Sequence, residues 1–264
     1  MISLAICCLI GWAQQFHAPQ AETELVPSTI GIEAGRPFQV ALHMKMAPGF
    51  HSYFINPGES GMATKIDWQL PEGFKAGPIR WPTPERIVVG GVAGYVYEKE
   101  VWLVTDITPP PTAWDTQKEP LIRANVTWLL CREACVPQHS SLWMVVHQTD
   151  EIKPNPAFAP AARSLSTNAQ GLVLNARIKD KTALLTVKQQ GGKASSVKFF
   201  PGDPTYFGAD IPTITSTSSG IEVEVPLSRY APAPPTRLTG LLVLPPSDGR
   251  GSGAHWIDIQ VTKS

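Results

Sequence analysis

The sequence predicts an all-β protein built from two β-sandwiches in tandem, and three observations indicate this fold. The 26 prolines and 21 glycines among the 264 residues disfavour long helices, because proline lacks a backbone donor and glycine resists helical order. Short runs rich in valine, isoleucine, tryptophan and tyrosine alternate with turn sequences along most of the chain. The length suits two domains, and a hydrophobic content of 43% is sufficient for a buried core.

The charge balance argues against nucleic acid as a partner. The 22 lysines and arginines equal the 22 aspartates and glutamates, and charged residues make up only 17% of the chain. A protein without net positive charge lacks the attraction that draws basic proteins to nucleic acids and anionic lipids. We therefore expect no nucleic-acid partner.

The first residues, MISLAICCLIGWA, form an apolar run that is too short to span a bilayer as a helix. We interpret residues 1–18 as a secretory signal peptide, cut after a position between Ala13 and Ala21. The alternative is a buried first strand, since no lysine or arginine precedes the apolar run. Cys7 and Cys8 would leave with the signal. No later apolar run approaches spanning length, so we expect an exported mature chain without a transmembrane segment.

Residues 22–150 carry the pattern of a first sandwich. In RPFQVALHMKM, apolar residues from Phe38 to Met46 occupy every second position, as in a half-buried strand. Further strand candidates follow, namely KIDWQL, EKEVWLVTDI, PLIRANVTWLL and SLWMVVH. The turns between them are rich in proline and glycine, which predicts closely spaced antiparallel strands.

The pattern stops at residues 151–170, which we interpret as a proline-rich linker in which AFAPAARSLS forms a short helix. Strand-like runs return over residues 171–264. In IEVEVPL, for example, the apolar residues alternate with Glu222 and Glu224. This segment is predicted to be the second sandwich.

The motif most suggestive of chemistry is Cys131-Arg-Glu-Ala-Cys135, directly after the apolar run VTWLL. A disulfide here would close a ring of only five residues and contribute about 2 kcal/mol on the loop-entropy model. On one helical turn the two Cα atoms would lie about 6 Å apart, within disulfide range. Short, constrained bridges are often exchange-active, which favours a redox pair over an inert structural bridge. Arg132 could favour the thiolate of Cys131, whereas Glu133 would oppose it.

A second interpretation uses the same cysteines as metal ligands. Cys131, Cys135 and His139 form a C-x3-C-x3-H pattern, and thiolate, imidazole and thioether groups are the ligands that Cu(I) prefers. Four other potential ligands could approach in space: His51, Met44, Met46 and Met144. Apart from this copper alternative, the sequence predicts no cofactor, and it carries no hydrolase motif.

Three segments resemble a known family: FHSYFINPGESGMATKIDWQLPEGFKAGPIRWPTPERI, GYVYEKEVWLVTDI and VTWLLCREACVPQ. They are similar to the amino-terminal periplasmic domain of the thiol:disulfide interchange protein DsbD. The ScsB-like branch looks closer still, since N-P-G-x-S-G, I-D-W and C-x3-C-x-P, which includes Pro137, occur there together. The resemblance covers about residues 24–146, and FFP, LTGLLVLP and WIDIQV resemble the second sandwich of that branch.

The resemblance implies two immunoglobulin-like β-sandwiches in the periplasm and a cysteine pair that passes electrons. Cys135 would form the mixed disulfide with a partner, and Cys131 would resolve it. His51 and Tyr53 fall where the family has aromatic neighbours of the pair. The family's cap loop, which shields the bridge with an aromatic ring, corresponds to residues without an aromatic here: Val88, Val89, Gly90, Gly91, Val92, Ala93 and Gly94.

Full-length relatives continue into a membrane domain and a thioredoxin-like domain, whereas this chain stops at Ser264. We therefore expect its partners to be a separate membrane thiol-disulfide reductase or thioredoxin-like protein, together with exported disulfide proteins. Three functions follow from the sequence. They are thiol-disulfide exchange, which is a protein-disulfide reductase role, copper(I) binding or delivery, and a non-catalytic adaptor with a structural disulfide.

Overall fold

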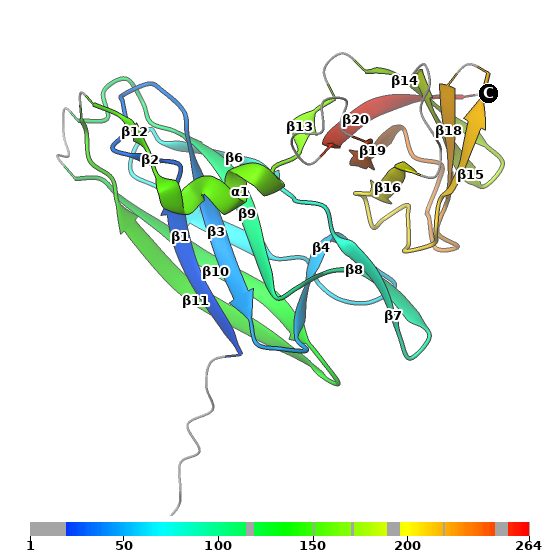
Figure 1. Ribbon diagram of the computed structural model, residues 1–264, viewed down its shortest axis with the longest axis horizontal. Coiled ribbons are helices and arrows are strands. Elements are labelled where there is room, and N and C mark those ends of the chain that lie inside the picture. Colours follow the sequence, from blue (N-terminus) through cyan, green and yellow to red (C-terminus); the bar gives the residue numbers. More distant parts are fainter. Residues whose placement is uncertain are drawn as a thin grey trace, which may run out of the picture.

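The prediction of an all-β protein is confirmed by a computed structural model of the chain (Figure 1). The structure describes residues 20–114, 119–149, 151–169, 172–188, 196–218, 220–245 and 253–263. The predicted signal peptide, residues 1–18, lies outside the described residues. No helix in the described part of the chain is long and apolar enough to cross a membrane.

The first sandwich consists of two antiparallel sheets. The four-stranded sheet has the order β1-β3-β9-β6, with the bounds β1 Ala21–Pro27, β3 Phe38–Met46, β9 Glu100–Thr108 and β6 Lys75–Arg80. The six-stranded sheet has the order β11-β10-β4-β8-β7, and β5 also pairs with β10. Its bounds are β11 Cys135–Val145, β10 Leu121–Cys131, β4 His51–Gly58, β8 Val92–Glu98, β7 Glu85–Val89 and β5 Lys65–Gln69.

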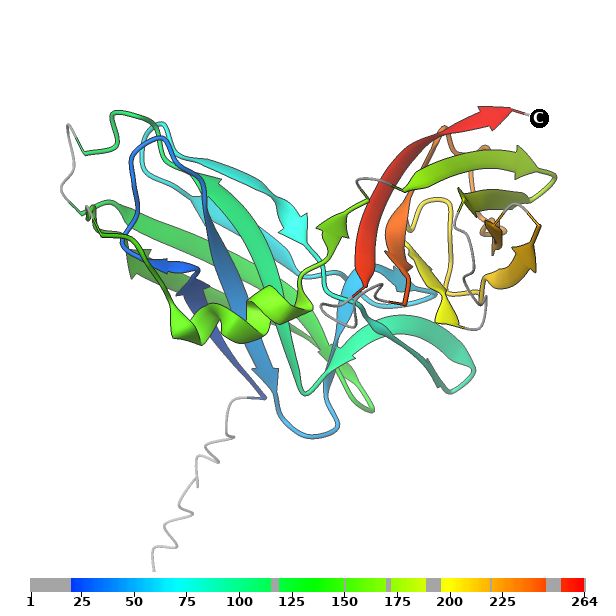
Figure 2. The same ribbon diagram turned by 45° about the horizontal axis from the view of Figure 1, so that its top comes forward.

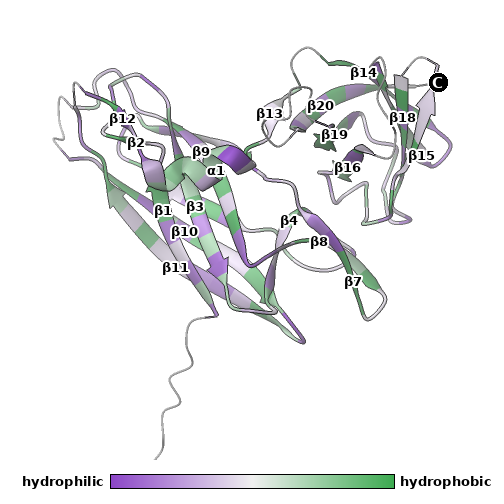
Figure 3. Ribbon diagram, in the orientation of Figure 1, coloured by the Kyte–Doolittle hydropathy of each residue, from purple (hydrophilic) through white to green (hydrophobic). Residues whose placement is uncertain are grey.

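Strand β10 shows how the sequence assigns side chains to the two faces of the larger sheet. Successive side chains of a strand point to opposite faces, and the even-numbered residues of β10 are the ones packed in the core: Ile122, Ala124, Val126, Trp128 and Leu130. Figure 3 shows similar alternation of hydrophobic and hydrophilic residues along several other strands. The odd-numbered residues, which end with Cys131, therefore lie on the outer face of the sheet.

The predicted linker is attached to the first sandwich. Strand β12 (Lys153–Pro154) pairs with β2 (Thr29–Ile30). The 3-10 helix η1 (Pro156–Phe158) and the helix α1 (Ala159–Ser164) follow, as the sequence predicts for AFAPAARSLS. Phe158 and Ala161 are buried against residues of β1, β3 and β9, so the helix lies across that sheet (Figure 1).

The second sandwich contains eight strands connected in the order β16-β19-β20-β14-β15-β18-β17, with β13 beside β20. Their bounds are β13 Thr167–Asn168, β14 Val173–Lys179, β15 Thr182–Lys188, β16 Lys198–Pro201, β17 Thr213–Thr217, β18 Gly220–Pro226, β19 Arg237–Val243 and β20 Ala254–Lys263. Strand β20 pairs with β19 along most of its length and with β14 only at its end. This change of partner lets the connected strands enclose a core (Figure 2).

The two sandwiches share part of their hydrophobic core. One buried cluster contains Phe54 and Tyr95 of the first sandwich together with Phe200 and Leu241 of the second. The Phe54 ring also makes an edge contact with Trp256 of β20, at a centroid distance of 6.5 Å. Because rings of both halves belong to one cluster, the second sandwich is packed against the first as well as linked to it. The sequence pattern did not predict this contact.

Candidate functional site

The two cysteines face each other across a β-hairpin. Cys131 ends β10, Cys135 begins β11, and the two residues are partners in the antiparallel ladder. They form a disulfide, with the Cα atoms 4.1 Å apart, which is close to the spacing of the narrow pairs of an antiparallel ladder. The helical turn considered from the sequence is therefore wrong. Residues 132–134 instead make a short hairpin loop, in which the Arg132 N–H donates to the Ala134 carbonyl at 3.2 Å.

The two sulfur-bearing residues differ strongly in their exposure. Cys131 is only 2% exposed, whereas Cys135 is exposed to solvent. Cys131 is buried on the outer face of the sheet in a small cluster formed with Tyr53, Val96, Ile87 and Leu129. A second protein can therefore reach Cys135 more easily than Cys131.

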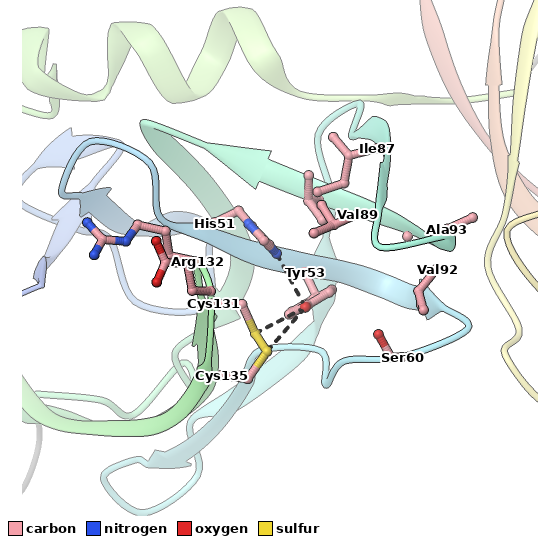
Figure 4. Close-up of a pocket in the computed structure, with 13 residues that line it drawn as sticks. His51, Tyr53, Ser60, Ile87, Val89, Val92, Ala93, Cys131, Arg132 and Cys135 are labelled. Atoms are coloured by element: carbon pink, nitrogen blue, oxygen red, sulfur yellow. Dashed lines mark hydrogen bonds between the residues drawn. A yellow bond between two sulfur atoms is a disulfide. The ribbon is translucent and has the colours of Figure 1, made fainter.

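A chain of hydrogen bonds connects β4 to the disulfide (Figure 4). The Tyr53 hydroxyl donates to Cys131 Sγ at 3.1 Å and lies 3.8 Å from Cys135 Sγ. His51 Nε2 lies 3.3 Å from the same hydroxyl oxygen. His51 pairs with Cys131 in the ladder between β4 and β10, and Tyr53 lies two residues further along the same face. When the hydroxyl proton points at sulfur, His51 must donate its Nε2 proton to the phenol oxygen.

Burial keeps the side chains of His51 and Tyr53 uncharged at neutral pH. It raises the pKa of Tyr53 above its ordinary value, because the phenolate would lose its hydration. Burial also lowers the pKa of His51, and the nearby Glu98 carboxylate partly opposes this shift. The site therefore presents a neutral hydroxyl donor to the sulfur atoms.

A cavity of about 180 Å³ lies beside the disulfide, and both cysteines, His51 and Tyr53 line it. The hairpin formed by β7 and β8 supplies its apolar wall, made of Ile87, Val89, Val92, Ala93, Gly94 and Val96. Arg132 and Glu133 also line the cavity. The Arg132 guanidinium lies over the Phe50 ring, 5.1 Å from the ring centroid.

The residues that the sequence assigns to a cap loop form the end of this β7–β8 hairpin. Gly90 and Gly91 make its two-residue turn, with φ values of 59° and 83°, and this left-handed backbone favours glycine. Val89 and Val92 flank the turn and line the cavity, together with Ala93 and Gly94. Val88, Val89 and Val92 are all largely exposed, at 56%, 55% and 41%.

Pro137 and His139 lie further along β11, opposite Leu129 and Thr127, and neither is among the lining residues of the cavity. His139 is four residues from Cys135 on the same face, about 13 Å along an extended strand. Among the described residues, no group of three or more histidine, cysteine, aspartate or glutamate side chains could hold a metal ion. Of the methionines considered as copper ligands, Met44 and Met46 are buried in the core, and Met144 packs against another core cluster.

Sequence analysis missed three residues that line the cavity, Ser60, Ile87 and Val96. Ile87 lies on β7 and Val96 on β8; Val96 is buried in the same cluster as Cys131, and Ile87 packs against that cluster. The alternation of YVYE marks Val96 as a strand residue, but the packing of a distant hairpin beside Cys131 leaves no signal in the sequence.

The β-sandwich fold, with a disulfide of one buried and one exposed cysteine beside a hydroxyl donor, defines a thiol-disulfide exchange module. Residues 18–146 match the family described as thiol:disulfide interchange protein DsbD, N-terminal. This part of the chain belongs to that family and is a DsbD amino-terminal domain.

Solved structures show that the likeness in fold extends over almost the whole chain. The amino-terminal periplasmic domain of ScsB from Proteus mirabilis superposes with a TM-score of 0.67 at 18% sequence identity, covering 94% of this chain and 95% of that one. The major pilin subunit of Bacillus cereus is far less similar, with a TM-score of 0.30 and 10% identity over 92% of this chain and 69% of that one. No curated protein matches the chain.

Proposed function

We propose that the protein exchanges disulfides with exported proteins through Cys131 and Cys135. The observation that carries this proposal is the difference between the two cysteines. Cys135 is exposed, and Cys131 is buried and accepts a hydrogen bond from Tyr53. Exchange needs one sulfur that a partner can reach and a second that is held in place to resolve the mixed disulfide.

The exchange proceeds in two balanced steps. The Cys135 thiolate of the reduced protein attacks a partner disulfide, so that a bond from Cys135 to one partner sulfur forms while the other partner sulfur leaves as a thiolate. The Cys131 thiolate then attacks Cys135 Sγ, forms the intramolecular disulfide and releases the first partner sulfur as a thiolate. The partner gains two electrons, this protein loses two, and both partner thiolates take protons from water.

Tyr53 would act on Cys131 in both directions of this exchange. A buried thiolate is costly unless a donor compensates for its lost hydration, and the hydroxyl at 3.1 Å is placed to do so. When a reductant attacks Cys135, Cys131 is the leaving thiolate, and leaving is faster when that thiolate is stabilised. His51 would hold the hydroxyl in this orientation through the contact between Nε2 and the phenol oxygen.

The partners follow from this chemistry. Restoring the reduced state requires a dithiol, which a membrane thiol-disulfide reductase or a thioredoxin-like protein would supply. The acceptors of the electrons are exported disulfide proteins. The ScsB domain with this fold is a periplasmic domain, which supports the periplasm as the location of this chain.

A trapping experiment tests the proposal. Cys131→Ser removes the resolving sulfur, so this variant, when reduced and mixed with an oxidised thioredoxin-like protein, should accumulate a mixed disulfide on Cys135. The measurement is non-reducing electrophoresis followed by mass spectrometry of the bridged peptides. The matched control Cys135→Ser retains only the buried Cys131 and should trap at least tenfold less.

Two results together would contradict exchange and favour the adaptor with a structural disulfide. One is the absence of a mixed disulfide in Cys131→Ser, with the thioredoxin-like protein or with glutathione disulfide as the probe. The other is a reduction potential of the wild-type pair below about −300 mV, which marks structural bridges.

A further inference from the structure

Three side chains of the first sandwich converge on one short segment of the second. Asn56 of β4, Arg86 of β7 and Tyr95 of β8 all donate hydrogen bonds to backbone carbonyls of residues 207–210. We call residues 207–210 the seat. The three donors come from the strands that carry Tyr53 and the hairpin wall of the cavity, so the seat contacts the strands that build the redox site.

Two of these hydrogen bonds come from side chains of the β7–β8 hairpin. Arg86 Nε donates to the Ala209 carbonyl at 2.7 Å, and the Tyr95 hydroxyl donates to the Asp210 carbonyl at 3.3 Å. Tyr95 is buried, and its ring packs edge-on against Phe200 of the second sandwich at 5.5 Å between centroids. Each strand of the β7–β8 hairpin therefore has its own bond to the seat.

Asn56 attaches β4 to the same segment. The pairing of β4 with β8 changes register between Tyr53 and Gly58. Asn56 lies within this interval and is completely buried. Asn56 Nδ2 lies 3.1 Å from the Phe207 carbonyl, and it also donates to the Pro201 carbonyl at 3.0 Å. The second sandwich thus supplies the partners of β4 where the pairing with β8 is interrupted.

The seat is itself fixed in the second sandwich. The Phe207 side chain is 1% exposed and belongs to the core of that sandwich. The Phe207 N–H also donates to the Asp203 carbonyl at 3.1 Å. The buried Phe207 ring and the hydrogen bond of the Phe207 N–H both fix the position of the seat. The seat can therefore act as a fixed attachment point for the hairpin.

The hairpin supplies part of the cover of Cys131. Val96 is buried in the same cluster as Cys131 and Ile87 packs against that cluster; they follow Tyr95 and Arg86 by one residue each. Movement of the hairpin away from this cluster would remove both apolar side chains from it. The exposure of Cys131 is therefore coupled to the bonds between hairpin and seat.

We propose that the second sandwich holds the β7–β8 hairpin over Cys131, with Arg86 and Tyr95 as positioning residues for the redox site. Release of these bonds opens the hairpin and exposes the resolving sulfur. The effect of this opening on disulfide exchange rests on the proposed function: if the cysteine pair exchanges disulfides, access to Cys131 sets how selectively the pair reacts. The opening itself is a property of the fold and can be measured without any partner.

The experiment measures access to the Cys131 thiol by its rate of alkylation with iodoacetamide. All proteins carry Cys135→Ser, so Cys131 is the only thiol of the chain without its signal segment. Arg86→Ala should raise the rate about tenfold, the factor expected for the loss of a hydrogen bond from a charged donor. Tyr95→Phe, which removes only the hydroxyl, should raise it about threefold. Arg86→Lys retains a cationic donor and should restore most of the slow rate.

Arg80→Ala is the matched control. Arg80 Nη2 also donates from the first sandwich to a backbone carbonyl, that of Ser166, at 2.7 Å. It lies on β6 of the other sheet, away from the hairpin, so its loss should leave the alkylation rate unchanged. Hydrogen exchange of the backbone amides in residues 85–98 should speed up in Arg86→Ala and stay the same in Arg80→Ala.

Equal alkylation rates in the parent, Arg86→Ala and Tyr95→Phe proteins would overturn the proposal. A rise of the same size in Arg80→Ala would also overturn it, because the effect would then be general loosening. Should Arg86→Ala fail to fold, Tyr95→Phe and the exchange of the hairpin amides decide the question. None of these results depends on whether the cysteine pair exchanges disulfides, so they are separate from the trapping experiment.

Discussion

The hydroxyl of Tyr53 donates a hydrogen bond of 3.1 Å to Cys131 Sγ across a sequence separation of 78 residues. Both residues are almost completely buried, at 5% and 2% exposure. A sulfur that was only structural would need no donor, because a disulfide carries no charge. The bond gains importance when the disulfide opens and Cys131 becomes a buried thiolate.

Tyr53→Phe should therefore slow the reduction of the disulfide by a dithiol about tenfold or more. The variant keeps the packing of the ring and removes only the donor to the leaving thiolate, and hydrogen bonds to charged groups contribute about 1.5–3 kcal/mol. The measurement is the pseudo-first-order rate of reduction by dithiothreitol at fixed pH. Tyr97→Phe is the control, since it also removes a buried hydroxyl, one that donates to the Pro82 carbonyl at 2.8 Å. A wild-type rate in Tyr53→Phe would contradict this role.

Stability should fall as the pH falls below about 6.5, the ordinary pKa of histidine. Burial lowers the pKa of His51 in the folded protein, so the unfolded chain binds a proton there more readily. The free energy of unfolding then decreases between the unfolded and the folded pKa and becomes constant below both. We expect this decrease to be smaller in His51→Gln.

Glu98→Gln supplies the opposite change. The Glu98 carboxylate raises the pKa of His51 against the effect of burial, so its removal should lower that pKa further and enlarge the acid destabilisation. Urea unfolding at pH 7.5 and 5.5 measures both variants. Identical pH dependence in wild type and His51→Gln would show that another group is responsible.

Reduction of the disulfide should lower the free energy of unfolding by about 2 kcal/mol and leave the protein folded. The bridge closes a ring of only five residues, and a ring of this size constrains the unfolded chain weakly. Urea unfolding with and without dithiothreitol tests this expectation. Unfolding of the protein on reduction in the absence of urea would assign the bridge a structural role.

Gly58→Ala should destabilise the protein by more than about 2 kcal/mol. Gly58 has a φ of 90°, and a Cβ there would lie 2.7 Å from the Ala93 carbonyl oxygen and 2.8 Å from the Ala209 Cβ. Ala93 belongs to the β7–β8 hairpin and Ala209 to the seat, so neither residue can move freely to make room for the methyl group. Gly90→Ala is the control, because its φ is also positive but no atom lies within 4 Å of its Cβ. It should cost only about 1 kcal/mol from backbone strain, as measured by thermal unfolding.

Much of the fold could be predicted because the strands of this chain follow a period of two. The alternation of Phe38 to Met46 predicts β3, and IEVEVPL predicts β18. AFAPAARSLS predicts the short helix α1. These elements depend on neighbouring residues, whose spacing is visible in the sequence.

The geometry of the cysteine pair could not be predicted in the same way. A separation of four residues fits both one helical turn and the end of a hairpin, and the sequence does not distinguish them. The pairing of Leu121–Cys131 with Cys135–Val145 along eleven residues decides for the hairpin. Once the cysteines are opposite each other in a ladder, one faces the neighbouring strand β4 and is covered, while the other lies on the outermost strand of the sheet and is exposed.

The sequence by itself determined the all-β architecture, the cysteine pair and the family of residues 18–146, because each is written in the spacing or identity of nearby residues. Only the tertiary structure decided that Tyr53 donates to Cys131, that Ile87 and Val96 supply part of its cover, and that the second sandwich holds their hairpin. Those contacts join residues far apart in the chain. They depend on which strands pair and which faces meet, and no local pattern of residues encodes that choice.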